Sequence, residues 1–285
     1  MYHSKNIEIQ IVDHCNLDCI ACSHESPLVV PWFQDPARLS HDISILWKWY
    51  RTELVKLLGG EPLLHPAINE VIAVIRARTD ARIRVVTNGV LLSQRYPWLI
   101  GVDEIHISCY TNASIPADDD LKSIAKEVGV PITIQAFGHF RWHRSQTRNG
   151  PKLVQQIFAT CQQYHLWQCH TLRGGWFYAC PAAATWARGY EEGVDLSSAL
   201  PDRQEKLEQL LMRSIPFKSC DRCLGSVGHR LSHHQGSRKL SGALSESEVD
   251  LAFLRQLQKN NDVHNGCFHY ERTILPSGYV QFYGD

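Results

Sequence analysis

The sequence has no excess of charge of either sign, almost no methionine and no long hydrophobic segment. The charges of its 29 basic and 29 acidic residues cancel. No strong positive electrostatic field therefore favours nucleic acid or an anionic membrane as a partner. No apolar run approaches the length of a transmembrane helix, and the N-terminal residues lack the apolar core of a signal peptide. Only 2 of the 285 residues are methionine, which argues against an adaptable methionine-rich surface. We therefore expect a cytoplasmic protein that binds neither membrane nor nucleic acid.

Cysteine, by contrast, is plentiful: there are 10 in the chain. In a reducing compartment, cysteines are more often metal ligands or catalytic groups than halves of disulfides. Cys15, Cys19 and Cys22 stand at C-x3-C-x2-C spacing directly after the alternating apolar run 7–12, which predicts a strand. Three thiolates on so short a loop can face one centre, and an ordinary iron–sulfur cluster takes four cysteines. The pattern predicts a cluster with one iron left open to another ligand.

The first half of the chain alternates predicted strands and helices. We expect strands over 54–58, 83–86, 105–110 and 130–136, and helices over 66–78 and 121–128. A further helix is expected to begin with Ser40 as its N-cap, followed by an apolar stripe that runs to Leu54. Regular alternation of this kind implies parallel strands joined by right-handed crossovers. The fold class is therefore α/β, with an open or partial barrel, and barrel active sites lie at the carboxyl ends of the strands.

Several polar or glycine-rich positions follow those strand ends. The predicted strand 54–58 ends in Gly59-Gly60-Glu61-Pro62, a tight turn whose exposed backbone groups suit either close approach to a ligand or an ordinary chain reversal. The remaining candidates at or just beyond strand ends are Thr87, Asn88, Ser108 and Gln135.

A second group of cysteines lies in the later part of the chain, after a predicted helix over 153–160. It comprises Cys161, Cys169, Cys180, Cys220 and Cys223. A predicted hairpin over 170–179 would bring Cys180 near the loop that precedes it, and Cys220 and Cys223 form a C-x2-C knuckle. Two hairpin thiols and a knuckle make a four-thiolate site, for which zinc and a [4Fe-4S] cluster are both candidates. Spacing alone leaves open whether Cys161 or Cys169 takes part.

Helices over 201–213 and 248–258 and a hairpin over 273–283 complete the prediction, and the polar stretch 229–247 is expected to close over a substrate. Cys267 belongs to neither cysteine group. A lone cysteine of this kind is either a small buried apolar residue or a thiol that donates a hydrogen atom.

Taken together, these residues resemble the radical S-adenosylmethionine (SAM) superfamily. The three N-terminal cysteines match its C-x3-C-x2-C signature, the glycine turn matches its GGE motif, and the alternating strands match its partial barrel. Ala21 stands where the superfamily often has an aromatic residue. The resemblance implies that SAM chelates the open iron and that its reductive cleavage gives a radical that abstracts hydrogen from a C–H bond. It also implies that Gly59, Gly60 and Glu61 hold the methionyl end of SAM. Thr87, Asn88 and Ser108 would then face the ribose, and Gln135 would line the same mouth.

The second cysteine group resembles an auxiliary-cluster domain of the SPASM/Twitch type. C-x13-G-x4-C fits its opening pattern with Cys161 as first ligand, and a single C-x2-C favours the shorter Twitch type with one auxiliary [4Fe-4S] cluster. The arrangement is similar to that of small dehydrogenases and epimerases of aminoglycoside pathways. It divides the chain into a barrel over 1–158, a cluster domain over 159–230 and a closing segment over 231–285.

The function expected from this resemblance is hydrogen abstraction from a hydroxyl-rich small molecule, such as a sugar, nucleoside or aminoglycoside, in natural-product biosynthesis. Epimerisation with Cys267 as hydrogen donor is favoured. The alternatives are dehydrogenation with electron transfer to the auxiliary cluster, sulfur insertion from that cluster, peptide modification, and a non-catalytic zinc scaffold. An enzyme of this kind needs an external one-electron donor of the flavodoxin or ferredoxin type.

Overall fold

The computed structural model describes the whole chain except residues 112, 187–191, 198–201, 237–247, 265–266 and 284–285. Within this part of the chain, one sheet has the strand order β12-β11-β5-β4-β3-β2-β1-β7-β8-β9, and β6 pairs with β10 in a second, small sheet. The strands are β1 (Tyr2–Val12), β2 (Tyr50–Gly59), β3 (Arg82–Thr87), β4 (Glu104–Tyr110), β5 (Ile132–Phe137), β6 (His139–Arg141), β7 (His170–Arg173), β8 (Trp176–Tyr178), β9 (Gly193–Asp195), β10 (Arg230–Ser232), β11 (Phe268–Ile274) and β12 (Val280–Tyr283). The α-helices are α1 (Pro36–Leu46), α2 (Ile68–Arg76), α3 (Leu92–Arg95), α4 (Asp118–Val128), α5 (Pro151–Ala159), α6 (Gln162–His165), α7 (Pro181–Trp186), α8 (Arg203–Leu211) and α9 (Leu251–Lys259).

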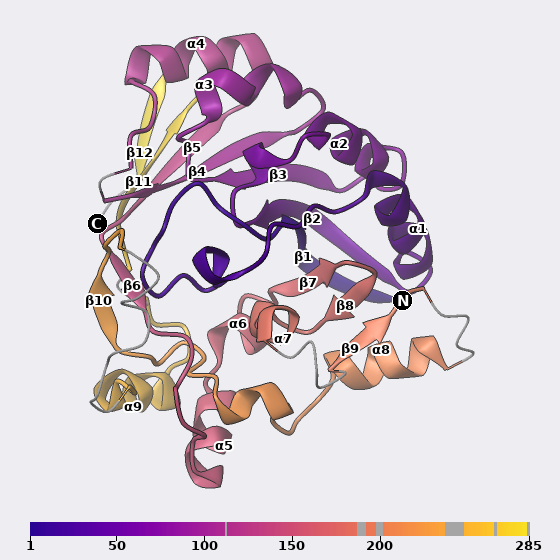
Figure 1. Cartoon of the computed structure of the whole chain (residues 1–285), viewed down its shortest axis with the longest axis vertical. Coiled ribbons are helices and arrows are strands. Elements are labelled where there is room, and N and C mark those ends of the chain that lie inside the picture. The colour runs from indigo at the N-terminus through magenta and orange to yellow at the C-terminus, as the bar shows by residue number, and fades with distance from the viewer. Residues whose placement is uncertain (112, 187–191, 198–201, 237–247, 265–266, 284–285) are drawn as a thin grey trace.

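The centre of the large sheet is parallel, as the alternation of strands and helices predicts. Strands β1 to β5 pair in sequence order, all parallel, and α1 to α4 cover one face of the sheet (Figure 1). Alternate strand residues such as Ile9, Leu57 and Val85 are fully buried in the core on that face. Because side chains alternate between faces in a strand, their neighbours point to the opposite, inner face. The partial α/β barrel predicted from the sequence is confirmed.

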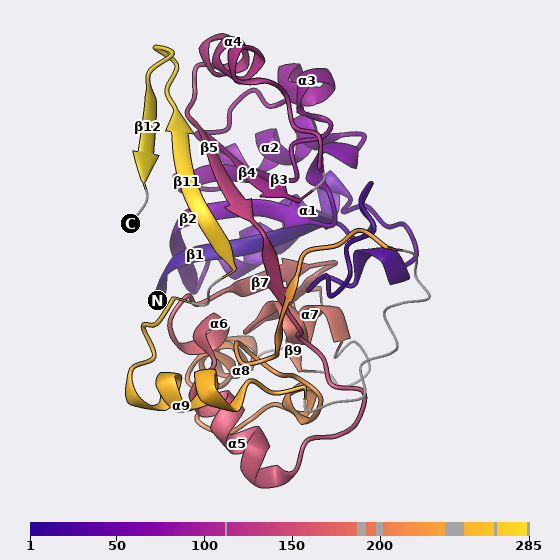
Figure 2. The same ribbon diagram turned by 90° about the vertical axis from the view of Figure 1, so that its left-hand side faces the viewer.

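Both edges of this sheet are extended by later parts of the chain. β7 pairs parallel with β1 and carries the hairpin partner β8, while β11 pairs antiparallel with β5 and carries β12. Figure 2 shows β12, β11 and β5 side by side along one edge. The large sheet therefore runs through the predicted boundaries at 158 and 230, and the three-part division of the chain stays a prediction.

The start of the first helix differs from the prediction. α1 begins at Pro36, and the N-cap is Asp35, whose side chain accepts a hydrogen bond from the Arg38 amide at 2.7 Å. Ser40 lies inside the helix. Proline is favourable at the first helical position, where no amide donor is needed, so Asp35-Pro36 defines the start better than Ser40. The predicted stripe also runs too far, because Tyr50 is already the first residue of β2 and is fully buried.

A smaller unit lies beside the barrel and contains α5 and α9 (Figures 1 and 2). Its own core includes Trp142, Leu224 and Phe253. Of the predicted closing stretch 229–247, residues 230–232 form β10, and residues 237–247 lie outside the described part of the chain. Among the helices that the structure describes, none is long and apolar enough to cross a membrane.

Candidate functional site

The glycine turn after β2 holds the start of the first cysteine loop. The Gly60 amide donates to the Val12 carbonyl at 2.8 Å, and the Glu61 amide donates to the His14 carbonyl at 3.0 Å. A Cβ atom added to Gly60 would lie 2.0 Å from the His14 carbonyl oxygen, and one added to Gly59 would lie 1.9 Å from that of Val12. Two chain segments thus pass backbone against backbone, which only glycine permits. This contact fixes the backbone of His14 and therefore the position of Cys15, the next residue.

Glu61 connects the same turn to the end of β3. Its buried carboxylate accepts hydrogen bonds from the Thr87 hydroxyl at 2.6 Å, the Asn88 amide at 2.8 Å and the Leu63 amide at 3.0 Å. Burial raises the pKa of Glu61 to about 7, and these hydrogen bonds partly offset the rise. Glu61 therefore links the carboxyl ends of β2 and β3 through hydrogen bonds.

Most of the predicted site residues line one cavity of about 270 Å³ at the carboxyl ends of the barrel strands. The predicted members in its lining are Cys15, Cys19, Cys22, Gly59, Gly60, Thr87, Asn88, Ser108 and Cys267. Of the residues predicted to bind SAM, Glu61 and Gln135 are not in this lining. Glu61 is turned to its three donors, and the Gln135 side chain contacts Glu271 at 3.4 Å and His106.

The three thiols of the first cysteine loop interact electrostatically with one another in a setting that disfavours the free thiolate. Burial is the main reason why the pKa values of Cys15 and Cys19 rise to about 12, and the charges of neighbouring cysteines raise them further. At the same time, the Leu17 amide lies 3.4 Å and the Asn88 side-chain amide 3.5 Å from the Cys15 sulfur. Buried sulfurs with N–H donors need a nearby positive charge to ionise, and a bound metal centre supplies one. The donor set therefore fits a cluster held by three thiolates.

Several side chains that line this cavity were not among the site residues predicted from the sequence. They include Tyr110, Phe140, His143, Gln163 and Trp167. Tyr110 ends β4 two residues after Ser108. Residues two apart in a strand point to the same face, so Tyr110 could have been predicted to line the cavity with Ser108. The others follow the last predicted barrel strand, 130–136, and their positions depend on the tertiary fold.

Four of the five later cysteines converge on a second place. Cys161, Cys180, Cys220 and Cys223 line an enclosed cavity of about 20 Å³, with room for roughly one water molecule. Burial raises the pKa of each thiol, while backbone N–H groups favour the thiolate, including that of Gly225 at 3.2 Å from the Cys223 sulfur. Such N–H···S contacts are typical of cluster ligands.

Cys169 lies apart from this group. It is buried beside Glu8 of β1, whose carboxyl group forms a hydrogen bond with its thiol. The structure thus brings Cys161, and not Cys169, to the cavity shared with Cys180, Cys220 and Cys223. Among the described residues, no three His, Cys, Asp or Glu side chains are placed to hold a single metal ion.

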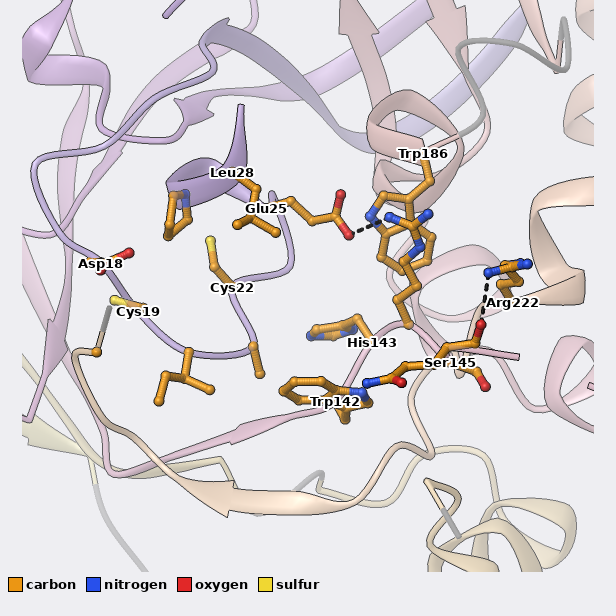
Figure 3. Close-up of a pocket in the computed structure, with 16 residues that line it drawn as sticks. Asp18, Cys19, Cys22, Glu25, Leu28, Trp142, His143, Ser145, Trp186 and Arg222 are labelled. Atoms are coloured by element: carbon orange, nitrogen blue, oxygen red, sulfur yellow. Dashed lines mark hydrogen bonds and ion pairs between the residues drawn. The ribbon is translucent and has the colours of Figure 1, made fainter. Parts of the chain in front are cut away.

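A larger cavity of about 400 Å³ adjoins the first and shares Cys19, Ala21, Cys22 and His143 with it. Figure 3 shows the cysteine loop on one side of it, and Trp186 and Arg222 on the other. Glu25 of the loop accepts an ion-pair hydrogen bond from Arg144 at 2.8 Å. This cavity therefore lies between the loop of the first cysteine group and the knuckle of the second, since Arg222 stands between Cys220 and Cys223.

Comparison with known families agrees with the arrangement of this site. The sequence model of the radical SAM superfamily matches residues 9–171, more than half of the chain. The chain belongs to the radical SAM superfamily. The matched range contains the cysteine loop, the glycine turn, strands β2 to β5 and the last residues of β1. Membership in this superfamily supports a [4Fe-4S] cluster and SAM as the cofactors of the site that the three cysteines line.

Characterised relatives of this radical SAM chain match it over part of their length. It is 31% identical over 108 residues to a GTP 3′,8-cyclase of Chlorobaculum tepidum, covering 37% of this chain and 32% of that protein. It is 32% identical over 113 residues to GTP 3′,8-cyclase 2 of Mycobacterium tuberculosis, covering 37% and 31%. The chain thus spans about a third of the length of these relatives.

Solved structures give similarities at low identity. The crystal structure of BtrN in complex with AdoMet and 2-DOIA superimposes with a TM-score of 0.47 at 14% identity, covering 76% of this chain and 83% of that one. Native anSMEcpe with bound AdoMet and Cp18Cys peptide gives 0.47 at 12% identity, covering 90% and 95%. At these scores neither likeness bears on substrate or reaction.

Proposed function

We propose that this radical SAM enzyme epimerises a carbon centre of a hydroxyl-rich small molecule, such as a sugar, nucleoside or aminoglycoside, with Cys267 as the hydrogen donor. The observation that supports the proposal is that Cys267 lines the same cavity as Cys15, Cys19 and Cys22. The three cysteines that would hold the cluster and the thiol that would quench the substrate radical therefore line one cavity.

The environment of Cys267 keeps it as a neutral thiol. Its side chain is buried, and burial raises its pKa, although Arg141 and Arg230 pull in the opposite direction. A neutral S–H is the form that transfers a hydrogen atom, because one S–H bond breaks as one C–H bond forms. The sulfur radical left behind takes up one electron and one proton to restore the thiol, and we assign that electron to an external donor of the flavodoxin or ferredoxin type.

The cluster and SAM together supply a radical that removes the first hydrogen atom from the substrate. The chain's own contribution is to place them. The Gly59–Gly60 turn fixes the first cysteine loop, and the Asn88 side chain donates to Asn16 of that loop at 2.7 Å. Ser108 of β4 also lines the cavity.

Other residues of the cavity lining suit a polar substrate. They include Arg141, His143, Gln163, Trp167 and Ser226. Guanidinium, amide and hydroxyl groups can bind several hydroxyl groups, and an indole ring offers an apolar face to a ring-shaped ligand. Burial lowers the pKa of His143 to about 4, so this imidazole is neutral near pH 7 and can accept or donate one hydrogen bond.

Dehydrogenation is the second candidate, favoured by one specific contact. Gly225 lines the same cavity, and a Cβ atom added to it would lie 3.6 Å from the Cys161 sulfur. The substrate cavity therefore reaches the second cysteine group. An auxiliary [4Fe-4S] cluster there would be close enough to accept the electron that dehydrogenation releases.

The experiment compares Cys267→Ala with Cys109→Ala, a half-buried cysteine of β4 that is not in the cavity lining. Reduced enzyme is incubated with SAM and a panel of monosaccharides, nucleosides and aminoglycosides in deuterated water, and products are followed by mass spectrometry. We expect wild type and Cys109→Ala to place one deuterium at an inverted carbon. Cys267→Ala should still form 5′-deoxyadenosine but no inverted product. Full inversion by Cys267→Ala would exclude its role as donor, and a wild-type product two hydrogens lighter would establish dehydrogenation instead.

A further inference from the structure

A segment far along the chain lies on the first cysteine loop. The Ile20 amide donates to the His234 carbonyl at 3.0 Å, and the Gly236 amide donates to the Asp18 carbonyl at 2.9 Å. The Gln235 side chain accepts from the Asp18 amide at 3.2 Å. Residues 233–236 thus pair antiparallel with residues 18–20 and cover the loop at Cys19.

The same segment places one imidazole against a cysteine sulfur. His233 is 2% exposed, and its Nε2 lies 3.2 Å from the Cys19 Sγ. The ring stacks on Tyr110 with centroids 5.1 Å apart and planes 17° apart, and Phe140 packs edge-on at 4.8 Å. The His233 backbone amide also donates to the Gly138 carbonyl at 2.8 Å. The ring is therefore held on several sides, and its orientation toward the sulfur is fixed by packing.

We propose that His233 is a positioning residue that donates an Nε2–H···S hydrogen bond to Cys19 and thereby raises the reduction potential of the SAM-binding cluster. The inference rests on the proposed function, since it requires Cys19 to be a cluster ligand. A thiol loses its proton when it binds metal, and a thiolate can only accept. The hydrogen of the shared contact then belongs to Nε2.

The direction of the effect follows from charge. Hydrogen bonds to ligand sulfurs help to set the potentials of iron–sulfur clusters. Reduction adds one negative charge to the cluster, so a donor at a ligand sulfur stabilises the reduced state more than the oxidised state. The other two cysteines already have backbone donors, Leu17 for Cys15 and both His24 and Ser26 for Cys22. The contact at Cys19 comes instead from a side chain, so a single substitution can remove it.

The test uses three variants of the full chain. His233→Phe keeps an aromatic ring for stacking but removes the donor, and His233→Gln keeps an N–H donor of similar reach. His234→Phe is the matched control, because the His234 side chain is exposed and its contact to Ile20 is made by the backbone. Each protein is reconstituted anaerobically with iron and sulfide. The potential is then measured by redox titration with electron paramagnetic resonance, and the signal that changes on adding SAM is assigned to the cluster with the open iron.

We expect a more negative midpoint potential for His233→Phe, a value closer to wild type for His233→Gln, and no change for His234→Phe. A His233→Phe protein with full iron content and the wild-type potential would overturn the inference while leaving the proposed function intact. If His233→Phe does not assemble the cluster, His233→Leu takes its place, and equal potentials for the Leu and Gln variants would overturn it. A wild-type protein without any SAM-responsive signal would instead refute the proposed function.

Discussion

Replacing Gly60 by alanine tests whether the glycine turn positions the first cysteine loop. The new Cβ would stand 2.0 Å from the His14 carbonyl oxygen and 2.7 Å from that of Asp13. Even the tightest Cβ contacts in proteins are near 3.0 Å, so the backbones must separate by at least 1.0 Å (3.0 − 2.0). Both obstacles are backbone atoms, which cannot rotate away as a side chain can. The His14 carbonyl that must move leads directly to Cys15.

The cost can be worked out from the contacts at the turn. Two hydrogen bonds, Gly60 to Val12 and Glu61 to His14, would be stretched or lost, at about 1 kcal/mol each. Overpacking adds about 1–3 kcal/mol. The sum is about 4 kcal/mol, which for a chain of this size lowers the melting temperature by about 8–16 °C. Displacement of Cys15 should also cost the first cluster, so that iron falls from about eight to about four per chain.

The assay is calorimetry or thermal denaturation of the reconstituted protein together with iron and sulfide determination. Gly150→Ala is the control, because Gly150 has φ −64° and no atom within 4 Å of an added Cβ. That variant should keep its iron and lose at most about 1 kcal/mol, the usual difference between helix-capping residues. An unchanged melting temperature and iron content in Gly60→Ala would refute the idea that the contact between the glycine turn and the His14 backbone positions Cys15.

Two further predictions concern other residues. Cys161→Ala should lose about four irons per chain, whereas Cys169→Ala should lose none, because Cys169 lies beside Glu8 and away from the four converging thiols; equal losses would contradict this assignment. Glu61 has a pKa of about 7 in the folded chain against 4.5 when exposed. Between pH 4.5 and pH 7 this carboxyl group is ionised in the unfolded chain but still protonated in the folded chain. Its contribution to the free energy of unfolding is therefore present at low pH and falls by about 3 kcal/mol as the pH rises to 7. The difference in free energy of unfolding between wild type and Glu61→Gln, from urea denaturation, should fall by about that amount between pH 5 and pH 8, and a constant difference would contradict it.

Much of the barrel and its mouth could be predicted from local patterns. Short signals mark the strand ends, and Thr87, Asn88 and Ser108, which follow such ends, line the cavity that Cys15 also lines. Their contact with SAM stays a prediction. The carboxyl ends of parallel barrel strands lie together at one end of the barrel, where active sites are found. Residues that follow different strands can therefore be assigned to one site from the sequence.

Other features could not be predicted because they depend on pairing between distant segments. Nothing local says that β7 pairs with β1 or that β11 pairs with β5. The choice between Cys161 and Cys169 rested on spacing alone, and the packing of Cys169 beside Glu8 separates them. His233 sits in a polar stretch without periodicity, and its contact to Cys19 joins residues 214 positions apart.

The most direct test of the central claim is SAM cleavage by the wild-type chain. The protein is purified and reconstituted without oxygen, its iron is counted, and 5′-deoxyadenosine is quantified after addition of a strong one-electron reductant. We expect 5′-deoxyadenosine from the wild-type protein and none when Cys15, Cys19 and Cys22 are replaced by alanine. A fully iron-loaded wild-type protein that leaves SAM intact under these conditions would contradict it.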